Sequence, residues 1–379
     1  MKRRFLLMML LLALPLGLGG CALYPERLHG VERLLVVQAM GLDYSGDALR
    51  LSLCSAADSA RGEGPVRLSG SGLTIRDAAD DVARRVTDEE LFCAHTGQLL
   101  IGEESARRGI GDVLRYVCRS RELRMDLPLY VVREGSAEEA LLGTGDERSG
   151  AVEVLEMLAA SAPAREGGEA PSVSRIAGTL EEGGCALVAA LRCVPASEQQ
   201  EDGALLTLAP AGCGVIRDGR LVAFLDEEDM AGLDLLTGAR GVHTLLVRDR
   251  NGRRVTLRTA PGKTSLRALR DGDGALTGLE LTVTLPVSVS EIDGRGALSD
   301  AAYADALTAA AEREILRRAG RVVGLEKSLG ADFLGLKERL ALLSTAGERE
   351  RDAALLAAPG ELEIRLAAGV TIQHANDLR

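Results

Sequence analysis

Apolar and polar positions follow two periods along the first half of the chain, so that strands alternate with helices. A buried strand begins at Leu34 and leads through Ala39–Tyr44 to a turn at Ser45-Gly46-Asp47. Short apolar runs and period-two alternation predict further strands over residues 48–53, 66–72, 98–102, 127–132 and 186–193. Apolar stripes at helical spacing and N-capping residues predict helices after Thr74, over Glu103–Val117, after Ser136, and over 152–160 and 174–182. This alternation is typical of an α/β sheet.

The second half has a different pattern. Asp218-Gly219 separates two apolar runs, Gly214–Arg217 and Leu221–Leu225, which predicts a hairpin. Strands over 205–208, 242–247 and 255–258 are also expected. Leu279–Val289 alternates most regularly, and Pro286 within it predicts an edge strand or a bulge. A long helix over about Asp300–Leu325 follows, then a helical piece over 336–343 and a last strand over 362–372. Strand pairs followed by helices indicate α+β.

The fold class expected for the whole chain is therefore mixed α/β and α+β, with several domains, sheets flanked by helices, and a long helix near the C-terminus. At about 150 residues per domain, 379 residues correspond to two or three domains. The stretch 161–171, rich in Ser, Pro, Gly and Glu, predicts flexibility. Residues 21–200 are expected to form an N-terminal α/β domain, and 201–379 a C-terminal α+β region that can divide into two subdomains.

The N-terminus has the pattern of a bacterial lipoprotein signal. Three basic residues, Lys2 to Arg4, precede an apolar run over Phe5–Leu18. The run ends in Leu18-Gly19-Gly20-Cys21, which looks like a lipobox. We therefore expect a signal peptide over residues 1–20 and a lipid-bearing Cys21. The two acyl chains of a diacylglyceryl group would hold the protein on a membrane firmly. The alternatives are a short uncleaved anchor and a plain secretory signal with a chance cysteine.

Charge and aromatic content exclude one class of partner. The formal net charge is −11, and the chain has no Trp, five Tyr and four Phe. Nucleic-acid binding needs a basic face and stacking aromatics, so no nucleic-acid partner is expected. Cleavage after Gly20 would remove three further positive charges. Because a net acidic body is not held to anionic lipid by charge, attachment is expected through Cys21 and protein partners.

No motif for catalysis, metal binding or cofactor binding is found. The six cysteines beyond Cys21 form no CxxC and lie mostly among apolar or small residues, which favours buried thiols, with Cys185 and Cys193 as the one close pair. The four histidines are scattered without ligand spacing. Neither a GxSxG elbow nor a P-loop is complete. We expect no catalytic residues, no metal and no cofactor.

Several segments stand in the order found in the Ger(x)C family, the C subunit of nutrient germinant receptors of spore-forming bacteria. They follow the lipobox at Cys21, and they are Met40–Asp43, Gly70–Ala78, Phe92–His95, Leu100–Ala106, Ile110–Leu114, Arg119–Glu122, Gly212–Val222 and Leu225–Gly232. The chain resembles this family over nearly its whole mature length. It departs from the family pattern at Ala22-Leu23, where Trp-Asp is frequent, and at Leu233–Leu236, where a Trp is missing.

The resemblance implies a lipid-anchored, non-enzymatic receptor subunit on the outer face of the spore's inner membrane, packed against integral-membrane subunits. A solute-binding lipoprotein of a transporter is the second hypothesis and predicts two similar lobes; an extracytoplasmic hydrolase is the third.

Some residues within the matching segments allow both a functional and a structural interpretation. His95 is either a partner contact or a satisfied histidine at the start of a strand. Residues Asp226 to Asp229 are either an acidic partner contact or a helix cap. The glycines expected at turns or close-packing positions are Gly41, Gly102, Gly219 and Gly232.

Overall fold

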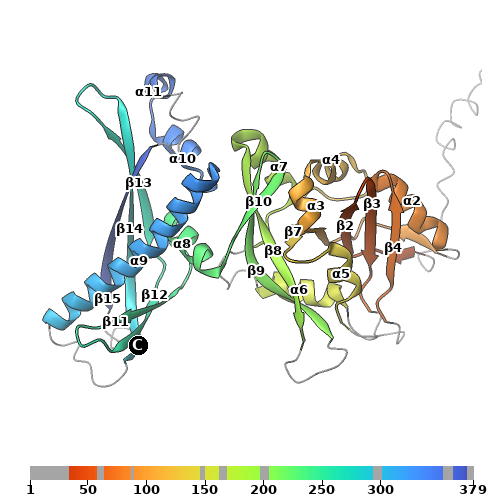
Figure 1. Cartoon of the computed structure of the whole chain (residues 1–379), viewed down its shortest axis with the longest axis horizontal. Coiled ribbons are helices and arrows are strands. Elements are labelled where there is room, and N and C mark those ends of the chain that lie inside the picture. The colour runs from red at the N-terminus through yellow and green to blue at the C-terminus, as the bar shows by residue number, and fades with distance from the viewer. Residues whose placement is uncertain are drawn as a thin grey trace, which may run out of the picture.

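The computed structural model describes residues 34–57, 64–86, 89–145, 150–161, 169–196, 205–292, 301–352 and 362–373. The predicted signal peptide, Cys21 and most of the stretch 161–171 lie outside the described residues. The mixed fold class is confirmed: sheets flanked by helices, with a long helix near the C-terminus (Figure 1).

An eight-stranded sheet forms the N-terminal part, in the order β10-β9-β8-β7-β6-β2-β3-β4. Its strands are β2 (Ala39–Ser45), β3 (Ala48–Cys54), β4 (Arg67–Gly72), β6 (Gln98–Gly102), β7 (Leu129–Val132), β8 (Cys185–Pro195), β9 (Leu206–Arg217) and β10 (Arg220–Leu225). Neighbouring strands β2, β6, β7 and β8 are parallel, and the strands on either side of them pair antiparallel. Two short strands, β1 (Leu34–Val36) and β5 (Glu90–Phe92), form a separate parallel pair.

Helices cover both faces of this sheet. One core is formed with α2 (Ile75–Arg85), α3 (Glu103–Arg108), α4 (Gly111–Arg119) and α7 (Val173–Gly183), and the other with α5 (Ala137–Leu142) and α6 (Ala151–Ser161). Parallel strands covered on both faces are apolar throughout, and the residues of β7 are all buried.

The second sheet consists of β11 (Thr244–Arg248), β12 (Arg254–Thr259), β13 (Lys263–Arg270), β14 (Leu276–Ile292) and β15 (Glu363–Gln373). Long β14 pairs with β13 and then β12 on one side, and with parallel β15 on the other. One face packs on α8 (Glu227–Thr237), α9 (Ala301–Leu329) and α10 (Leu336–Leu343), while α11 (Ala346–Arg351) follows α10. Figure 1 shows α9 crossing in front of this sheet.

Some predicted elements are divided or joined in the structure. The strand expected from Leu34 through Tyr44 is two strands, β1 and β2. The single helix expected over Glu103–Val117 is interrupted: Gly109 has a φ of +149°, which an L side chain rarely adopts, and its N–H donates to Ser105 O to end α3. The strands expected at 205–208 and 214–217 are one strand, β9.

Pro286 does not mark a sheet edge, because β14 has neighbours on both sides. It lies between Thr284, the last residue paired with β13, and Val287, the first paired with β12. On this side of β14 the partner strand changes from β13 to β12 at Pro286, so no strand-pairing hydrogen bond needs the N–H that proline lacks.

The boundary between the sheets differs from the expected domain division. Strands β9 and β10 follow residue 200 but complete the first sheet beside β8. The two sheets therefore divide after Leu225 and not at residue 200. Within the described part of the chain, no helix combines the length and the apolar character needed to cross a membrane.

Candidate functional site

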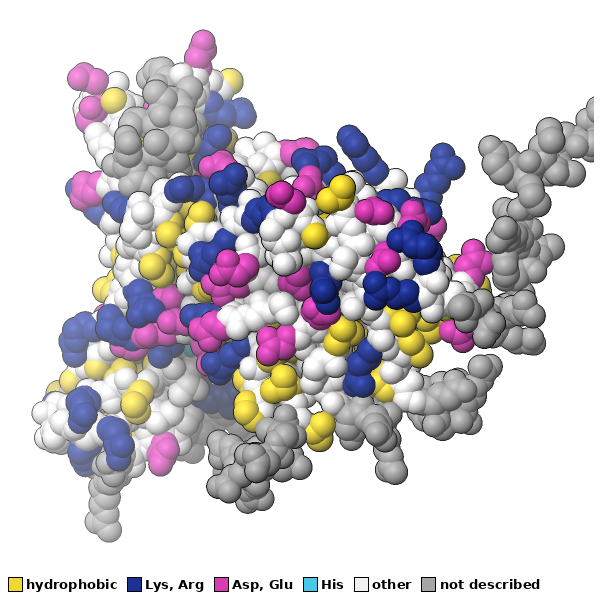
Figure 2. Space-filling view, turned by 45° about the vertical axis from the view of Figure 1, so that its right-hand side comes forward, with side chains coloured by type: hydrophobic (Ala, Val, Ile, Leu, Met, Phe, Trp, Pro, Cys, Tyr) yellow, Lys and Arg dark blue, Asp and Glu magenta, His cyan; other side chains and the backbone are white. Residues whose placement is uncertain are grey.

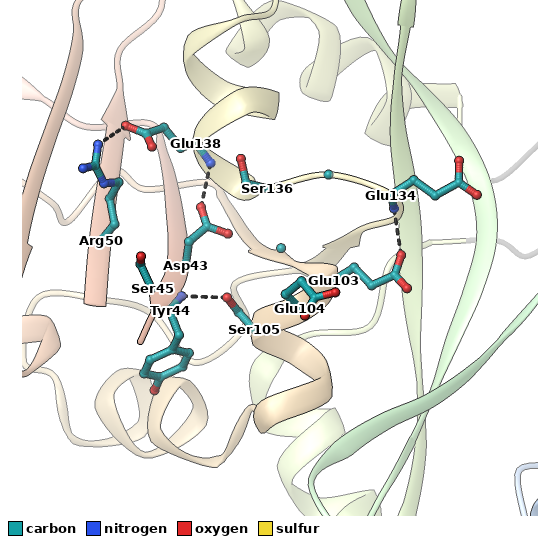
Figure 3. A pocket seen from close by; sticks show the side chains of 12 residues that line it. Asp43, Tyr44, Ser45, Arg50, Glu103, Glu104, Ser105, Glu134, Ser136 and Glu138 are labelled. Atoms are coloured by element: carbon teal, nitrogen blue, oxygen red, sulfur yellow. Dashed lines mark hydrogen bonds and ion pairs between the residues drawn. The ribbon is translucent and has the colours of Figure 1, made fainter. Parts of the chain in front are cut away.

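A crevice lies at the carboxyl ends of the parallel strands. After β6 the chain turns into α3 on one face of the sheet, and after β7 it turns into α5 on the other. Open α/β sheets bind ligands where neighbouring connections diverge in this way. The crevice has a volume of about 800 Å³, and its side chains are drawn in Figure 3. It is lined by Asp43, Tyr44, Ser45, Arg50, Gly102, Glu103, Glu104, Ser105, Glu134, Gly135, Ser136 and Glu138.

Asp43, at the end of β2, binds the start of α5. Its Oδ1 accepts the N–H of Ala137 at 3.0 Å, and its Oδ2 accepts the N–H of Glu138 at 2.8 Å. Burial raises the pKa of the Asp43 carboxyl, and the backbone hydrogen bonds oppose that rise. The first N–H groups of a helix otherwise attract external anions. Here a carboxylate of the chain itself satisfies them.

Two glycines allow this contact. A Cβ on Gly102 would lie 2.2 Å from Asp43 Oδ1 and 3.0 Å from Ser136 Cα. A Cβ on Gly41 would lie 2.9 Å from Leu141 Cδ1, a side chain of α5. The Met40–Asp43 and Leu100–Ala106 segments therefore meet in space, and both hold α5 on the sheet.

The other polar side chains of the crevice also bind within the chain. Glu103 accepts the N–H of Glu134 at 2.8 Å, and Ser105 Oγ accepts the N–H of Tyr44 at 2.7 Å. Hydrogen bonds with backbone and Arg107 lower the pKa of Glu103 although its burial acts in the opposite direction.

The crevice walls are acidic and contain no nucleophile beside a base. Arg50, the basic side chain of the lining, pairs with Glu138 at 2.7 Å. The side chains of Ser105 and Ser136 are both engaged. Ser105 Oγ accepts the N–H of Tyr44, and Ser136 Oγ accepts the N–H of Glu139 at 3.0 Å. No histidine or cysteine lines the crevice. These contacts bind β2, α3 and α5 to one another, and they supply no group arranged for acyl or phosphoryl transfer.

The acidic segment 226–229 caps α8. Asp226 accepts the N–H of Asp229 at 2.9 Å, and the Asp229 side chain accepts the N–H of Asp226 at 3.2 Å, which makes a capping box. Arg321 of α9 bonds to both carboxylates. The helix-cap interpretation is confirmed, and the segment also joins α8 to α9.

His95 lies exposed between β5 and β6, with its ring centroid 5.5 Å from that of Phe92. It does not reach the crevice lining.

The structural interpretation of the glycines is confirmed. Gly219 has a φ of +74° in the β9–β10 turn. A Cβ on Gly232 would lie 2.7 Å from Val322 Cγ2 and 2.8 Å from Arg318 O in α9, so this glycine lets two helices approach closely.

The six described cysteines are free thiols. Burial is confirmed for Cys54, Cys185 and Cys213, whereas Cys118 is exposed. Burial raises the pKa of Cys54 to about 11 and those of Cys185 and Cys213 to about 12, so these thiols are unreactive at neutral pH. The close pair Cys185 and Cys193 lies along one strand, β8, where eight residues span roughly 26 Å, and a disulfide is impossible.

Two buried polar contacts could not be predicted from the sequence pattern. His243 Nε2 lies 2.7 Å from Asp234 Oδ2, and the histidine side chain is fully buried, which ties α8 to β11. Glu326, at the end of α9, is 1% exposed. Neither belongs to a motif, because each depends on a contact between separate elements. In the described ranges, no three His, Cys, Asp or Glu side chains gather to hold a metal ion.

Known proteins resemble this chain in fold and in family pattern. No match was found among curated proteins. A solved structure titled "Crystal Structure of the GerBC protein" is 15% identical, with a TM-score of 0.57, and the alignment covers 89% of this chain and 97% of that one. At that identity the likeness concerns the fold alone.

Two family profiles match in order along the chain. One, described as "Spore germination protein N-terminal domain", matches residues 29–188. The other, described as "Spore germination B3/ GerAC like, C-terminal", matches residues 211–344. Together they cover most of the chain and agree with the motifs of the sequence. The chain belongs to the Ger(x)C family of spore germination proteins.

Proposed function

We propose that this chain is the lipid-anchored, non-catalytic C subunit of a nutrient germinant receptor. Diacylglyceryl Cys21 would attach it to the outer face of the spore's inner membrane, where it packs against integral-membrane subunits. The observation that carries the proposal is the order of the two spore germination profiles behind a lipobox.

The hydrogen bonds within the crevice support a structural role for it over a catalytic one. Its carboxylates and serines are engaged with backbone N–H groups of the chain, and a nucleophile needs a free lone pair and an adjacent base. Such a site serves to fix the positions of β2, α3 and α5.

The location of the crevice also favours a second candidate, a solute-binding lipoprotein. That candidate predicts two similar lobes, whereas this chain has an eight-stranded mixed sheet followed by a five-stranded one of different topology. A thermal shift series with amino acids and sugars separates the two. A rise in Tm with one solute class would favour solute binding, and an unchanged Tm throughout would favour the receptor subunit.

The anchor is tested by labelling with radioactive palmitate in the producing cell. The wild-type chain should take up label and Cys21→Ala should not. Cys118→Ala is the matched control, because it removes an exposed thiol of the body and should keep the label. Label on the Cys21→Ala chain would show that the anchor assignment is wrong.

The receptor role is tested by purification from detergent-solubilised spore membranes. A tagged chain should carry integral-membrane proteins with it, in fixed stoichiometry. Recovery of the chain alone, under detergent conditions that preserve other membrane complexes, would contradict the proposed assembly.

A further inference from the structure

The second sheet ends on one side at a long strand whose outer edge is open. β15 has 11 residues that pair with β14, and no described element pairs with its other side. The N–H of Val370 points to that open side, because it donates to Glu312 Oε1 of α9 at 3.3 Å. Since backbone groups alternate in direction along a strand, the N–H and C=O groups of every second residue face outward. These residues are Ile364, Leu366, Ala368, Val370 and Ile372.

The side chains of the same five residues form an apolar row that is incompletely buried. They pack against the core beneath α9, but each of them is only partly buried. Their register partners on β14 are at most 2% exposed, and these are Leu279, Leu281, Val283, Leu285 and Val287. A further strand beside β15 would bury the rest of this row and pair its free backbone groups.

Another edge in the molecule shows how an exposed strand is protected. On β4, Asp81 of α2 accepts the N–H of Ser71 at 3.0 Å, and Arg85 of α2 donates to Ser69 O at 3.0 Å. Short strands, charged side chains and covering helices are the usual means of protecting an edge. On the much longer β15, the described residues supply one such contact to the outer backbone, that of Glu312.

The outer edge of β15 also carries little charge. Glu363 and Arg365 near its start bind each other at 2.9 Å, and no charged residue follows through Gln373. On the face shown in Figure 2, by contrast, basic and acidic side chains are interspersed. A long, neutral and apolar edge is the kind that pairs with another strand.

The sequence of β15 is complementary to a second copy of itself in antiparallel orientation. If a two-fold axis passes through Ala368, the outward-facing residues of the two copies form hydrogen-bonded pairs. All pairs on the core side are apolar: Ile364 with Ile372, Leu366 with Val370, and Ala368 with its own copy. The pairs on the opposite side bring no like charges together: Glu363 with Gln373, Arg365 with Thr371, and Ala367 with Gly369.

One flank of α9 runs beside this edge. Glu312 contacts the N–H of Val370, and a Cβ on Gly320 would lie 3.9 Å from Leu366 Cδ1. Helical spacing places Leu316 between Glu312 and Gly320 on the same stripe. Leu316 is partly exposed and belongs to none of the described apolar cores. A strand added to β15 would therefore meet an apolar side chain of α9 as well.

We propose that two copies of this chain pair through β15, antiparallel about Ala368, so that their second sheets become one continuous sheet. Glu312, which binds the N–H of Val370 in the single chain, releases it to Leu366 O of the other copy. The pairing does not depend on the proposed function, although attachment of both copies to one membrane would raise their effective concentration.

The register is tested by cross-linking of engineered cysteines. Arg365 and Thr371 would form a non-hydrogen-bonded pair between copies, with Cα atoms about 4.5 Å apart, which a disulfide spans. Within one chain they lie roughly 20 Å apart along the strand, so no disulfide can close there. Residues 21–379 with Cys21→Ser and Cys118→Ser are the background, and adding Arg365→Cys with Thr371→Cys should give covalent dimers under mild oxidation.

Each single cysteine variant is the matched control for the double variant. In the proposed register, the two copies of a lone cysteine at residue 365 or 371 lie roughly 20 Å apart, so each single variant should cross-link about 10-fold less. Circular dichroism establishes that every variant is folded.

The charge of the pair gives a second test, in which the dimer Kd is measured by sedimentation equilibrium. Thr371→Glu places a carboxylate opposite Arg365 twice in each dimer, and Thr371→Arg places a guanidinium there. The Kd should change by roughly 2- to 30-fold, becoming lower for Thr371→Glu and higher for Thr371→Arg. The same two substitutions at Thr179, exposed on α7, should alter the Kd by less than about 2-fold.

Three results would overturn the pairing: no covalent dimer from the folded double variant, equal yields from single and double variants, or Kd changes of the same sign in both Thr371 variants. A chain that stays monomeric, yet loses the integral-membrane proteins it carries when Ala368→Pro removes an outward N–H, would assign the edge to a receptor partner instead. Because Cys21 is replaced in the cross-linking background, its outcome does not bear on the anchor, which the palmitate experiment tests.

Discussion

Glu326, near the end of α9, is a buried carboxyl whose environment affects stability. Its Oε2 accepts the N–H of Leu334 at 2.9 Å, whereas its Oε1 has no partner among the described residues. Burial, with a contribution from nearby Asp332, raises the pKa of Glu326 to about 8; Arg339 and Lys327 act in the opposite direction. The folded chain therefore holds this carboxyl protonated at neutral pH.

The free energy of unfolding should fall as the pH rises from 4.5 to about 8. Between the ordinary pKa of glutamate, 4.5, and the folded value of about 8, the folded state binds a proton that the unfolded state has lost. The free energy of unfolding should decrease by up to about 1.4 kcal/mol per pH unit there. Glu326→Gln should remove this slope, leaving stability near pH 5 almost unchanged and raising it at pH 8.

Urea unfolding of wild type and Glu326→Gln at pH 5.5 and pH 8 measures this effect. Glu104→Gln is the matched control, because Glu104 is exposed and its substitution should leave the wild-type slope in place. A wild-type slope unaltered by Glu326→Gln would show that another group is responsible.

Glycine roles could be predicted at the residue scale, and buried polar pairs could not. Gly41, Gly102, Gly219 and Gly232 stand in recognisable segments, and a glycine there points to a turn or a close approach. His243 and Asp234 share no motif, and only the packing of α8 against β11 brings them together.

At the scale of elements, the contact between α8 and α9 depends on Gly232. A methyl group there would press on backbone Arg318 O and on Val322. Gly232→Ala should therefore lower the free energy of unfolding by about 1–3 kcal/mol, despite the better helix propensity of alanine.

Gly324→Ala is the control, in the exposed part of α9, where an added Cβ meets nothing within 4 Å. It should be neutral or stabilising by up to about 1 kcal/mol. Equal effects of the two substitutions in chemical denaturation would mean that the α8–α9 contact is not close-packed.

Most elements could be located from periodicity, while their interruptions could not. The long helix, the β9–β10 hairpin and the alternation of β14 follow from local pattern. The break at Gly109 depends on a non-local contact, since Ile110 N–H donates to Gly219 O at 2.9 Å. The β13 strand was missed because its alternation is weak, and pairing with β14 fixes it.

At the scale of the whole molecule, the two sheets divide after Leu225. Strands β8 and β9 pair across the division expected at residue 200. Pairing between distant strands is not encoded in local composition, so the sheet boundary after Leu225 could not be predicted from it.

This division predicts the behaviour of fragments. Residues 21–226 contain the complete first sheet and should unfold cooperatively in urea. Residues 21–200 leave β8 without β9 and should not. A fragment 21–200 that unfolds as cooperatively as 21–226 would contradict the division.

In the proposed function, the lipid anchor, the body and the membrane subunits act together in the spore. The most direct measurement is nutrient-triggered germination in a strain whose other genes of this family have been deleted. Removal of this gene should abolish the response, the wild-type chain should restore it, and Cys21→Ala should restore it poorly. Spores that lack the gene and still germinate at the wild-type rate would contradict the account.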